Sequence, residues 1–338
     1  RIEVNIVNIE KDLNYRVFNI TDGRLYTDRI HDTAVMLDNK IVEESSFQLR
    51  YNLNGTIYNS NIKNNIVFKK GTPRKLRKIK GTVLSLLTGG GGNSNYWHWL
   101  YDVLPRLRLC EEIKKLKDVD YFLFPSLEKK FQVETLKILN IEEKKLLPSK
   151  KFRHILASEL IVTDHPYNLT NNFHNDSQNI PIWIIKWLRE QFLKNLNKLK
   201  TNYPKKIYLE RADSKLIKAQ ERSMINEDEV KKFLINKNFA FVKLNELPFA
   251  EQINHFYNAN YVIGLHGAGF ANLSFCRERT KVIEFRTETT GSVIENLAKK
   301  NNLEFDSIIC TAKAPEYAKQ SGHIKIPLDL LEQKMSEI

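Results

Sequence analysis

Hydrophobic and polar positions follow two different rhythms along this chain. The first 70 residues carry short apolar runs separated by Asn, Asp and Gly, at Ile2–Ile9, Thr33–Leu37 and Ile57–Tyr58. Runs of this length bounded by turn residues predict short strands and hairpins. Asn54-Gly55 has the composition of a two-residue hairpin turn. This part of the chain therefore predicts a strand-rich start, and it shows no catalytic chemistry.

From Tyr121 onward, strand patterns alternate with amphipathic helical patterns. This alternation predicts a parallel sheet with helices on both faces, the α/β class. The predicted strands are 121–124, 155–163, 206–209, 239–243, 261–264 and 281–285. The predicted helices are 128–139, 181–199, 227–236 and 248–259, with a helix start at 267–275 and a terminal helix at 327–335.

The length of 338 residues allows one large domain or two ordinary ones. We place the boundary in the helix and linker of residues 181–204, which gives domains of 1–190 and 191–310. The tail 311–338 carries the terminal helix, which we expect to pack back on the first domain.

A strand at Val83–Leu87 leads into four glycines at 89–92 and then a helix, with Ser94 or Asn95 as its N-cap. Pro105 is expected to kink or break this helix. His98 and Asp102 are four residues apart and share one helix face. An Asp that polarises a His is a common general-base arrangement. The alternative is a structural His held in an aromatic core by its two Trp neighbours.

The strand Tyr261–Gly264 ends in a small-residue turn, Leu265-His266-Gly267-Ala268-Gly269-Phe270-Ala271-Asn272. Backbone N–H groups at such a helix start can bind an anion, and glycine lets that anion approach closely. The turn matches neither the dinucleotide fingerprint nor the P-loop, so the type of anion stays open. A purely structural turn is the alternative.

Charged residues next to these strands extend the second cluster. Glu284 lies near the end of the following strand, where it can hold ribose hydroxyls or pair with a neighbour such as Arg286. Arg211 follows the strand 206–209, and Arg222 lies in a loop. Both suit phosphate binding, and both are also explained as surface charges. Asn226 is expected to cap the next helix.

Composition adds a preference for anionic partners. Lys and Arg number 53 against 40 Asp and Glu, a formal net charge of +13. The run KKGTPRKLRKIK at 69–80 suits lipid phosphate or nucleic acid, but without interleaved aromatic residues a solvated loop is the favoured interpretation. Three scattered cysteines indicate a reducing compartment. Asp118-Val-Asp120 has the DxD spacing of metal-dependent transferases, but it precedes a strand and is interpreted as a chance match.

Three segments together resemble the motifs of glycosyltransferase family 61. The first is Asn95-Tyr-Trp-His98-Trp-Leu-Tyr-Asp102-Val-Leu-Pro-Arg106-Leu. The second joins Ile207-Tyr-Leu-Glu-Arg211 to Arg222-x-x-x-Asn226-Glu227, and the third joins Val262-Ile-Gly-Leu-His266-Gly-Ala-Gly269-Phe-Ala-Asn272 to Val282-Ile-Glu284. The resemblance spans about residues 90–285, and Phe270 departs from the Leu that is frequent in the family.

The resemblance implies a GT-B fold, with two Rossmann-like domains facing each other across a cleft. Residues 1–190 would form the acceptor side and 191–310 would bind the nucleotide sugar. The family's inverting, metal-independent chemistry implies no cofactor beyond the donor. Asp102, with His98 beside it, would be the base. The donor would be bound by a set of residues in the second half: Arg211, Arg222, His266, Gly267, Ala268, Gly269, Asn272 and Glu284.

The implied partners are a nucleotide sugar and a glycan or lipid-linked glycan acceptor, in surface polysaccharide or glycoconjugate synthesis. The basic surface adds an anionic membrane as a partner. The expected location is the cytoplasm, peripheral at a membrane, or the secretory-pathway lumen in a eukaryote. Two alternatives are a basic nucleic-acid-binding protein, which leaves both clusters unexplained, and a non-catalytic glycan-binding protein, which would be expected to lack the base or phosphate residues.

Overall fold

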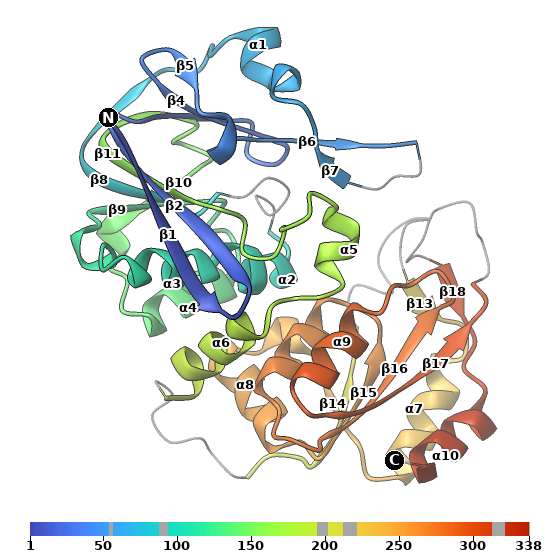
Figure 1. Ribbon diagram of the computed structural model, residues 1–338. Helices are drawn as coiled ribbons and strands as arrows, with labels where there is room; N and C mark the ends of the chain where they lie inside the picture. The colour runs from blue at the N-terminus through green and yellow to red at the C-terminus, as the bar shows by residue number, and fades with distance from the viewer. Residues whose placement is uncertain (54–56, 88–93, 195–201, 212–221, 313–321, 338) are drawn as a thin grey trace. The chain divides into compact units, whose positions relative to one another are not determined.

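The computed structural model describes residues 1–53, 57–87, 94–194, 202–211, 222–312 and 322–337 (Figure 1). The chain divides into two compact units, unit 1 at Arg1–Leu188 and unit 2 at Arg189–Ile338. Each unit combines strands with helices, which confirms the α/β class. The predicted turn at Asn54-Gly55 and the four glycines lie outside the described residues.

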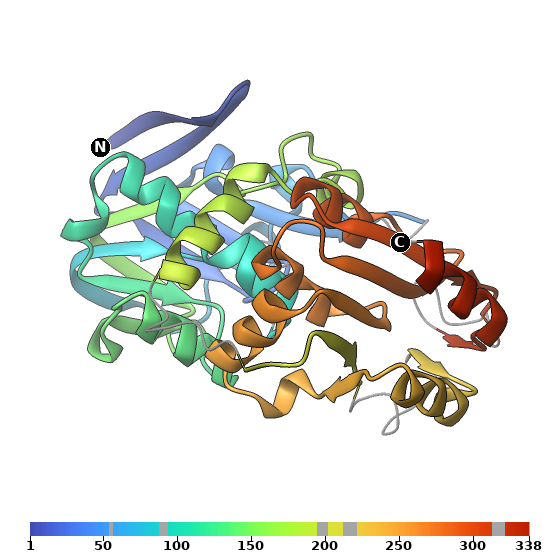
Figure 2. The same cartoon turned by 90° about the horizontal axis from the view of Figure 1, so that it is seen from below.

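The strands of unit 1 form one 11-stranded mixed sheet. They are β1 Ile2–Glu10, β2 Leu13–Thr21, β3 Arg24–Thr27, β4 Asp32–Leu37, β5 Lys40–Ile41, β6 Phe47–Tyr51, β7 Ile57–Asn59, β8 Arg77–Ser85, β9 Tyr121–Phe124, β10 Leu146–Pro148 and β11 His154–Thr163. The first seven pair antiparallel, which confirms the strand-rich start. The hairpin of β1 and β2 extends beyond the other strands of unit 1 (Figure 2).

The parallel part of this sheet has the strand order β10-β9-β8-β11. In chain order these are the third, second, first and fourth parallel strands, the order found in Rossmann-like sheets. The strand order reverses between β8 and β11. Ligands of open α/β sheets bind at the carboxyl ends of strands at such a reversal, so the segments that follow Ser85 and Thr163 are the places to look.

Helices and short turns connect the strands of unit 1. They are α1 Ile66–Lys70, α2 Tyr96–His98, η3 Trp99–Val103, α3 Pro105–Glu112, α4 Lys130–Ile138 and α5 Phe173–Ser177. The 3₁₀ turns are η1 Glu43–Ser45, η2 Ile62–Asn64, η4 Leu116–Asp118 and η5 Glu143–Lys145. Helix α6, Ile182–Lys194, crosses the boundary between the units.

Unit 2 contains a five-stranded parallel sheet of order β14-β12-β15-β16-β17. The strands of unit 2 are β12 Lys206–Leu209, β13 Arg222–Met224, β14 Ala240–Val242, β15 Tyr261–Leu265, β16 Lys281–Thr287, β17 Glu304–Cys310 and β18 Gly322–Ile324. Its helices are α7 Glu227–Asn236, η7 Leu244–Glu246, α8 Phe249–Asn258, η8 Ala268–Phe275, α9 Val293–Lys300 and α10 Leu328–Glu337. The strand order reverses between β12 and β15, as in flavodoxin-like sheets.

Helices cover both faces of this sheet, as the sequence predicts. Leu234 of α7 and Leu331 of α10 pack in one core with Ile263 and Phe285 of the sheet. Figure 1 shows α8 and α9 on the opposite face. The apolar side of α10 thus packs within unit 2, and the packing of the terminal helix on the first domain stays a prediction.

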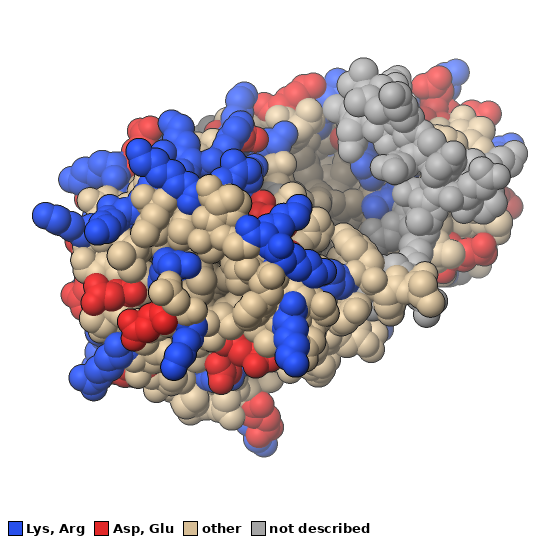
Figure 3. Space-filling model, turned by 90° about the horizontal axis from the view of Figure 1, so that it is seen from above, with Lys and Arg blue, Asp and Glu red and all other residues tan. Residues whose placement is uncertain are grey.

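The basic run at 69–80 is not a continuous loop. Its first residues end α1, and its last residues, from Arg77, begin β8. All seven of its Lys and Arg residues are exposed, as a solvated segment requires. Figure 3 shows that Lys and Arg outnumber Asp and Glu over the described part of one face.

Gly264 allows β15 to approach its neighbours closely. A Cβ at this position would lie 3.0 Å from Leu209 Cβ and 3.3 Å from the Phe270 ring. We expect Gly264→Ala to destabilise the protein by about 1–3 kcal/mol through overpacking. Urea denaturation measures this loss. Gly269→Ala is the control, because its Cβ would meet only the end of the Leu244 side chain, and its loss should be smaller.

Candidate active site

The first predicted cluster lies in unit 1, on a helical segment made of α2, the π-helical turn η3 and α3. The Asn95 side chain accepts hydrogen bonds from the N–H groups of Trp97 and His98, which identifies Asn95 as the N-cap. Residues Trp99–Val103 then form a π-helical turn, in which the N–H of Leu104 donates to the Trp99 carbonyl at 3.1 Å. Pro105 has no N–H to continue the ladder and begins α3, so the predicted break is confirmed.

His98 and Asp102 are in direct contact, as their spacing predicts. Nδ1 of His98 lies 2.8 Å from Oδ2 of Asp102. The Asp102 side chain is only 2% exposed, whereas that of His98 is 34% exposed. Because Nδ1 is occupied by the carboxylate, Nε2 is the ring nitrogen left for a substrate. The more accessible partner of this pair is therefore the histidine.

The two groups shift each other's pKa in opposite directions. Burial by itself would lower the pKa of His98, but the charge and hydrogen bond of Asp102 outweigh it and raise this pKa above its ordinary value. Burial would raise the pKa of Asp102, but His98 and His165 outweigh it and hold the pKa of this carboxyl well below its usual range. Asp102 is thus a fixed buried anion that favours the protonated form of His98.

His165, which no sequence pattern indicates, completes this cluster from the segment just after β11. Its Nε2 lies 3.7 Å from Oδ2 of Asp102. Its Nδ1 accepts hydrogen bonds from the N–H groups of Tyr167 and Asn168, so the proton of the neutral ring is on Nε2 and faces the carboxylate. Burial lowers the pKa of His165, which keeps the ring neutral.

Two further buried side chains surround Asp102. Arg106 is 1% exposed and donates to the Asp102 carbonyl at 3.1 Å and to the Thr163 carbonyl at 2.9 Å. It thereby ties the helical segment to the end of β11. Burial and then the Asp102 charge raise the pKa of Tyr167 well above its ordinary value. The cluster lies at the strand reversal between β8 and β11, where the topology favours a ligand site.

The second predicted cluster lies at the strand reversal of unit 2. Arg211 follows β12, and Arg222 begins β13. Nη1 of each donates to the same acceptor, the His266 carbonyl, at 2.9 and 2.8 Å. Two guanidinium groups thus converge on the turn after β15. A phosphate group beside this turn would meet both positive charges.

The turn itself is tightly packed against these arginines. Gly267 is extended, and a Cβ at this position would lie 3.3 Å from Nη1 of Arg211. Ala268 and Gly269 open η8, which is a 3₁₀ helix. The sequence predicted only a helix start here. Asn272 is fully buried and donates to Gln252 and to the Gly269 carbonyl, so its amide holds the turn from within.

Glu284 lies behind His266 and not at an open surface. Its carboxylate contacts Nδ1 of His266 directly, and the residue has 0% exposure. The register pairs Glu284 with Gly264, next to the turn. This placement speaks against a contact with ribose hydroxyls and favours a positioning role, in which the carboxylate fixes the imidazole. Burial lowers the pKa of His266, and the Arg222 and Arg211 charges lower it further.

Two other predictions concern residues near these clusters. Asn226 stands at the N-cap position of α7 without a side-chain cap, because its amide exchanges two hydrogen bonds with the backbone of Ile326. Asp120 precedes β9 and accepts a hydrogen bond from the Thr82 N–H, so the DxD match has a structural role. Among the described residues, no group of three His, Cys, Asp or Glu side chains is arranged to hold a metal ion.

Comparison with known proteins shows the family of this chain. The glycosyltransferase 61 family matches residues 96–283, which is more than half of the chain. The protein therefore belongs to the glycosyltransferase 61 family, and the predicted family membership is confirmed. The match includes all of the predicted site residues except Glu284, which lies one residue beyond it. A search of curated proteins found no match.

None of the described helices has the length and apolar character needed to cross a bilayer.

Proposed function

We propose that this glycosyltransferase moves a sugar, with inversion, from a nucleotide-sugar donor to a hydroxyl group of a glycan acceptor. The observation that carries the proposal is the convergence of Arg211 and Arg222 on the turn at His266–Gly269. It supports a diphosphate site in unit 2. We further propose a GT-B arrangement, in which unit 1 binds the acceptor and unit 2 the donor, for surface polysaccharide or glycoconjugate synthesis.

The donor step needs positive charge where the leaving group forms. The bond between the sugar C1 and the diphosphate oxygen breaks, and its electron pair stays on the diphosphate. Arg211 and Arg222, together with the backbone N–H groups of Gly267 to Gly269, would stabilise that charge. Because these groups are held in place by the protein, we propose that no bound metal is required.

The acceptor step needs a base on the other face of the sugar. The acceptor oxygen forms a new bond to C1 as its proton passes to Nε2 of His98. Asp102 would then hold the ring through Nδ1 and stabilise the resulting imidazolium. This division of roles differs from the family-based expectation that Asp102 takes the proton. It rests on the exposure of His98, 34%, against 2% for Asp102.

The location and the other partners remain part of the proposal. An anionic membrane surface suits the exposed Lys and Arg of the segment 69–80. A lipid-linked acceptor would place the enzyme at the cytoplasmic face of a membrane, or within the secretory-pathway lumen in a eukaryote.

A thermal-shift screen with UDP, GDP, CDP, CMP and dTDP, with and without EDTA, tests the donor site. A ligand present at about 100 times its Kd stabilises the native state by ~2.7 kcal/mol. We expect one nucleotide to raise Tm equally with and without EDTA. The shift should disappear in Arg211→Ala and persist in Arg279→Ala, whose side chain is 86% exposed on the surface. Unchanged Tm with every nucleotide would contradict the diphosphate site.

A further inference from the structure

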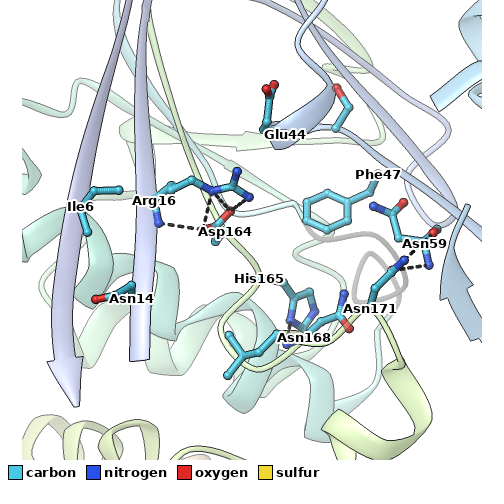
Figure 4. A pocket seen from close by; sticks show the side chains of 12 residues that line it. Ile6, Asn14, Arg16, Glu44, Phe47, Asn59, Asp164, His165, Asn168 and Asn171 are labelled. Atoms are coloured by element: carbon cyan, nitrogen blue, oxygen red, sulfur yellow. Dashed lines mark hydrogen bonds and ion pairs between the residues drawn. The ribbon is translucent and has the colours of Figure 1, made fainter. Parts of the chain in front are cut away.

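A pocket of about 460 Å³ lies in unit 1 (Figure 4). Its volume falls within the range of ~300–1,000 Å³ typical of small-molecule sites. His165 connects the pocket to the His98–Asp102 pair, because its ring lines the pocket while its Nε2 faces Asp102 at 3.7 Å. A molecule in this pocket would therefore be separated from the proposed base, His98, by two side chains in contact, His165 and Asp102.

The pocket walls come from two parts of the chain. One wall consists of residues of β1, β2, η1, β6 and β7, and the other of the segment after β11. The second wall, with His165 and Asn168, lies within the family match, whereas the first wall lies before residue 96 and outside it. A pocket that joins family-matched residues near the base to residues outside the match is suited to determine acceptor choice.

Fixed polar pairs preorganise the pocket. Arg16 and Asp164 form a two-pronged ion pair, with Nη2 at 2.9 Å from Oδ1 and Nε at 3.1 Å from Oδ2. Asn59 and Asn171 form two hydrogen bonds. The Asn59 N–H donates to Oδ1 of Asn171 at 3.1 Å, and Nδ2 of Asn171 donates to the Asn59 carbonyl at 3.0 Å. Figure 4 shows these pairs on opposite sides of the pocket. Side chains already held in place lose little entropy when a ligand binds.

The chemistry of the lining fits a sugar ring. Asn14 provides an amide that both donates and accepts hydrogen bonds, as sugar hydroxyls require, and Asn168 adds a second amide whose oxygen is buried without a partner. Phe47, Ile6 and Leu169 add apolar surface for the C–H faces of the ring, and the last two are 59% and 43% exposed.

The charge of the lining selects against anions. Its ionised side chains are Arg16, Asp164 and Glu44, because His165 is held neutral. One positive and two negative charges leave a net charge of −1, in contrast to the +13 of the whole chain. A sulfated, sialylated or uronic-acid unit would be repelled here.

We propose that this pocket is an acceptor subsite that binds a neutral sugar unit of the glycan next to the reacting one. The inference rests on the proposed transferase function. It assigns part of the acceptor choice to the first 60 residues, in which the sequence shows no chemistry.

The test uses the full-length protein on a glycan array that carries neutral and acidic oligosaccharides. We expect binding to neutral glycans only. Asn168→Ala should weaken this binding about two- to tenfold, the loss of one or two hydrogen bonds. Asn14→Trp should abolish it by filling the pocket. The control is Glu3→Trp, because Glu3 is exposed in the same hairpin, lies on the face opposite to Ile6 and Asn14 and does not line the pocket.

The outcomes separate this inference from the proposed function. If the pocket inference is right, Asn14→Trp loses glycan binding while its thermal shift with the nucleotide is kept. Binding only to acidic glycans, no binding, or equal loss in Glu3→Trp would overturn the pocket assignment. A wild-type protein that binds neutral glycans through this pocket but shows no nucleotide shift would leave the pocket standing and remove the donor site.

Discussion

Replacing His98 with alanine is expected to lower kcat/KM for glycosyl transfer by about 10²–10⁴-fold, the usual contribution of a general base. The reason is geometric, because His98 offers Nε2 from a side chain that is 34% exposed while Nδ1 is held by Asp102. His98→Asn is the sharper variant. Its amide can still donate to Asp102, yet it has no second nitrogen to accept a proton. Steady-state kinetics with a fixed donor and acceptor measures the loss.

The matched control for this variant is His31→Ala. His31 lies 3.7 Å from Asp28 in unit 1, so it is also a histidine paired with an aspartate, but it is at the surface with 42% exposure. We expect this change to leave kcat/KM unchanged. A His98→Asn enzyme with wild-type kcat/KM would show that the proton goes elsewhere.

The pH dependence of kcat/KM distinguishes His98 as the base from Asp102 as its positioning partner. A base must be neutral to act, so kcat/KM should rise with pH through the pKa of His98, which Asp102 holds above its ordinary value of about 6.5. Asp102→Asn removes that charge while burial remains, so the residual activity should have its acid limb at lower pH. If Asp102 were itself the base, Asp102→Asn would lose the acid limb together with the activity.

The sequence predicted those elements whose signals are local. Tyr121–Phe124, Lys206–Leu209 and Glu227–Asn236 agree with β9, β12 and α7 at both ends. The two strands are short, largely apolar runs, and the helix has its apolar residues on one face. Each signal lies within the segment itself, so it can be recognised without knowing the tertiary contacts. Strands β10 and β17 were missed. The β17 segment carries polar residues among apolar ones and is only partly buried, so its pairing with β16 defines it.

The candidate site shows the same division. His98 with Asp102 follows from helical spacing alone, and the turn at His266–Gly269 follows from its glycines. The role of His165 could not be predicted from local spacing, because His165 comes close to Asp102 only when β11 pairs with β8. Its one available signal was its position just after a long apolar strand. Glu284 is predicted from its position near the end of a strand, but its burial against His266 depends on the register of β15 with β16, which no local pattern contains.

Replacing Arg211 with alanine is expected to lower kcat by about 10²–10³-fold, as the loss of one oxyanion donor does elsewhere. The same range applies to Arg222→Ala, because both guanidinium groups donate to the His266 carbonyl, at 2.9 and 2.8 Å. Arg211→Lys should recover only part of the loss, since an ammonium keeps the charge but not the two-pronged geometry. Arg279→Ala, a surface change in the same unit, should leave kcat unchanged.

The double variant tests whether the two arginines act as one unit. Residues that share a partner show interaction energies of about 0.5–3 kcal/mol in double-mutant cycles. Once either arginine is removed, the other has lost its neighbour at the shared oxygen and is less well aimed at the diphosphate. The combined loss in kcat should therefore be smaller than the product of the two single losses. Losses that multiply without interaction would mean that the two side chains contact the donor independently, and that their convergence on His266 only holds the turn in shape.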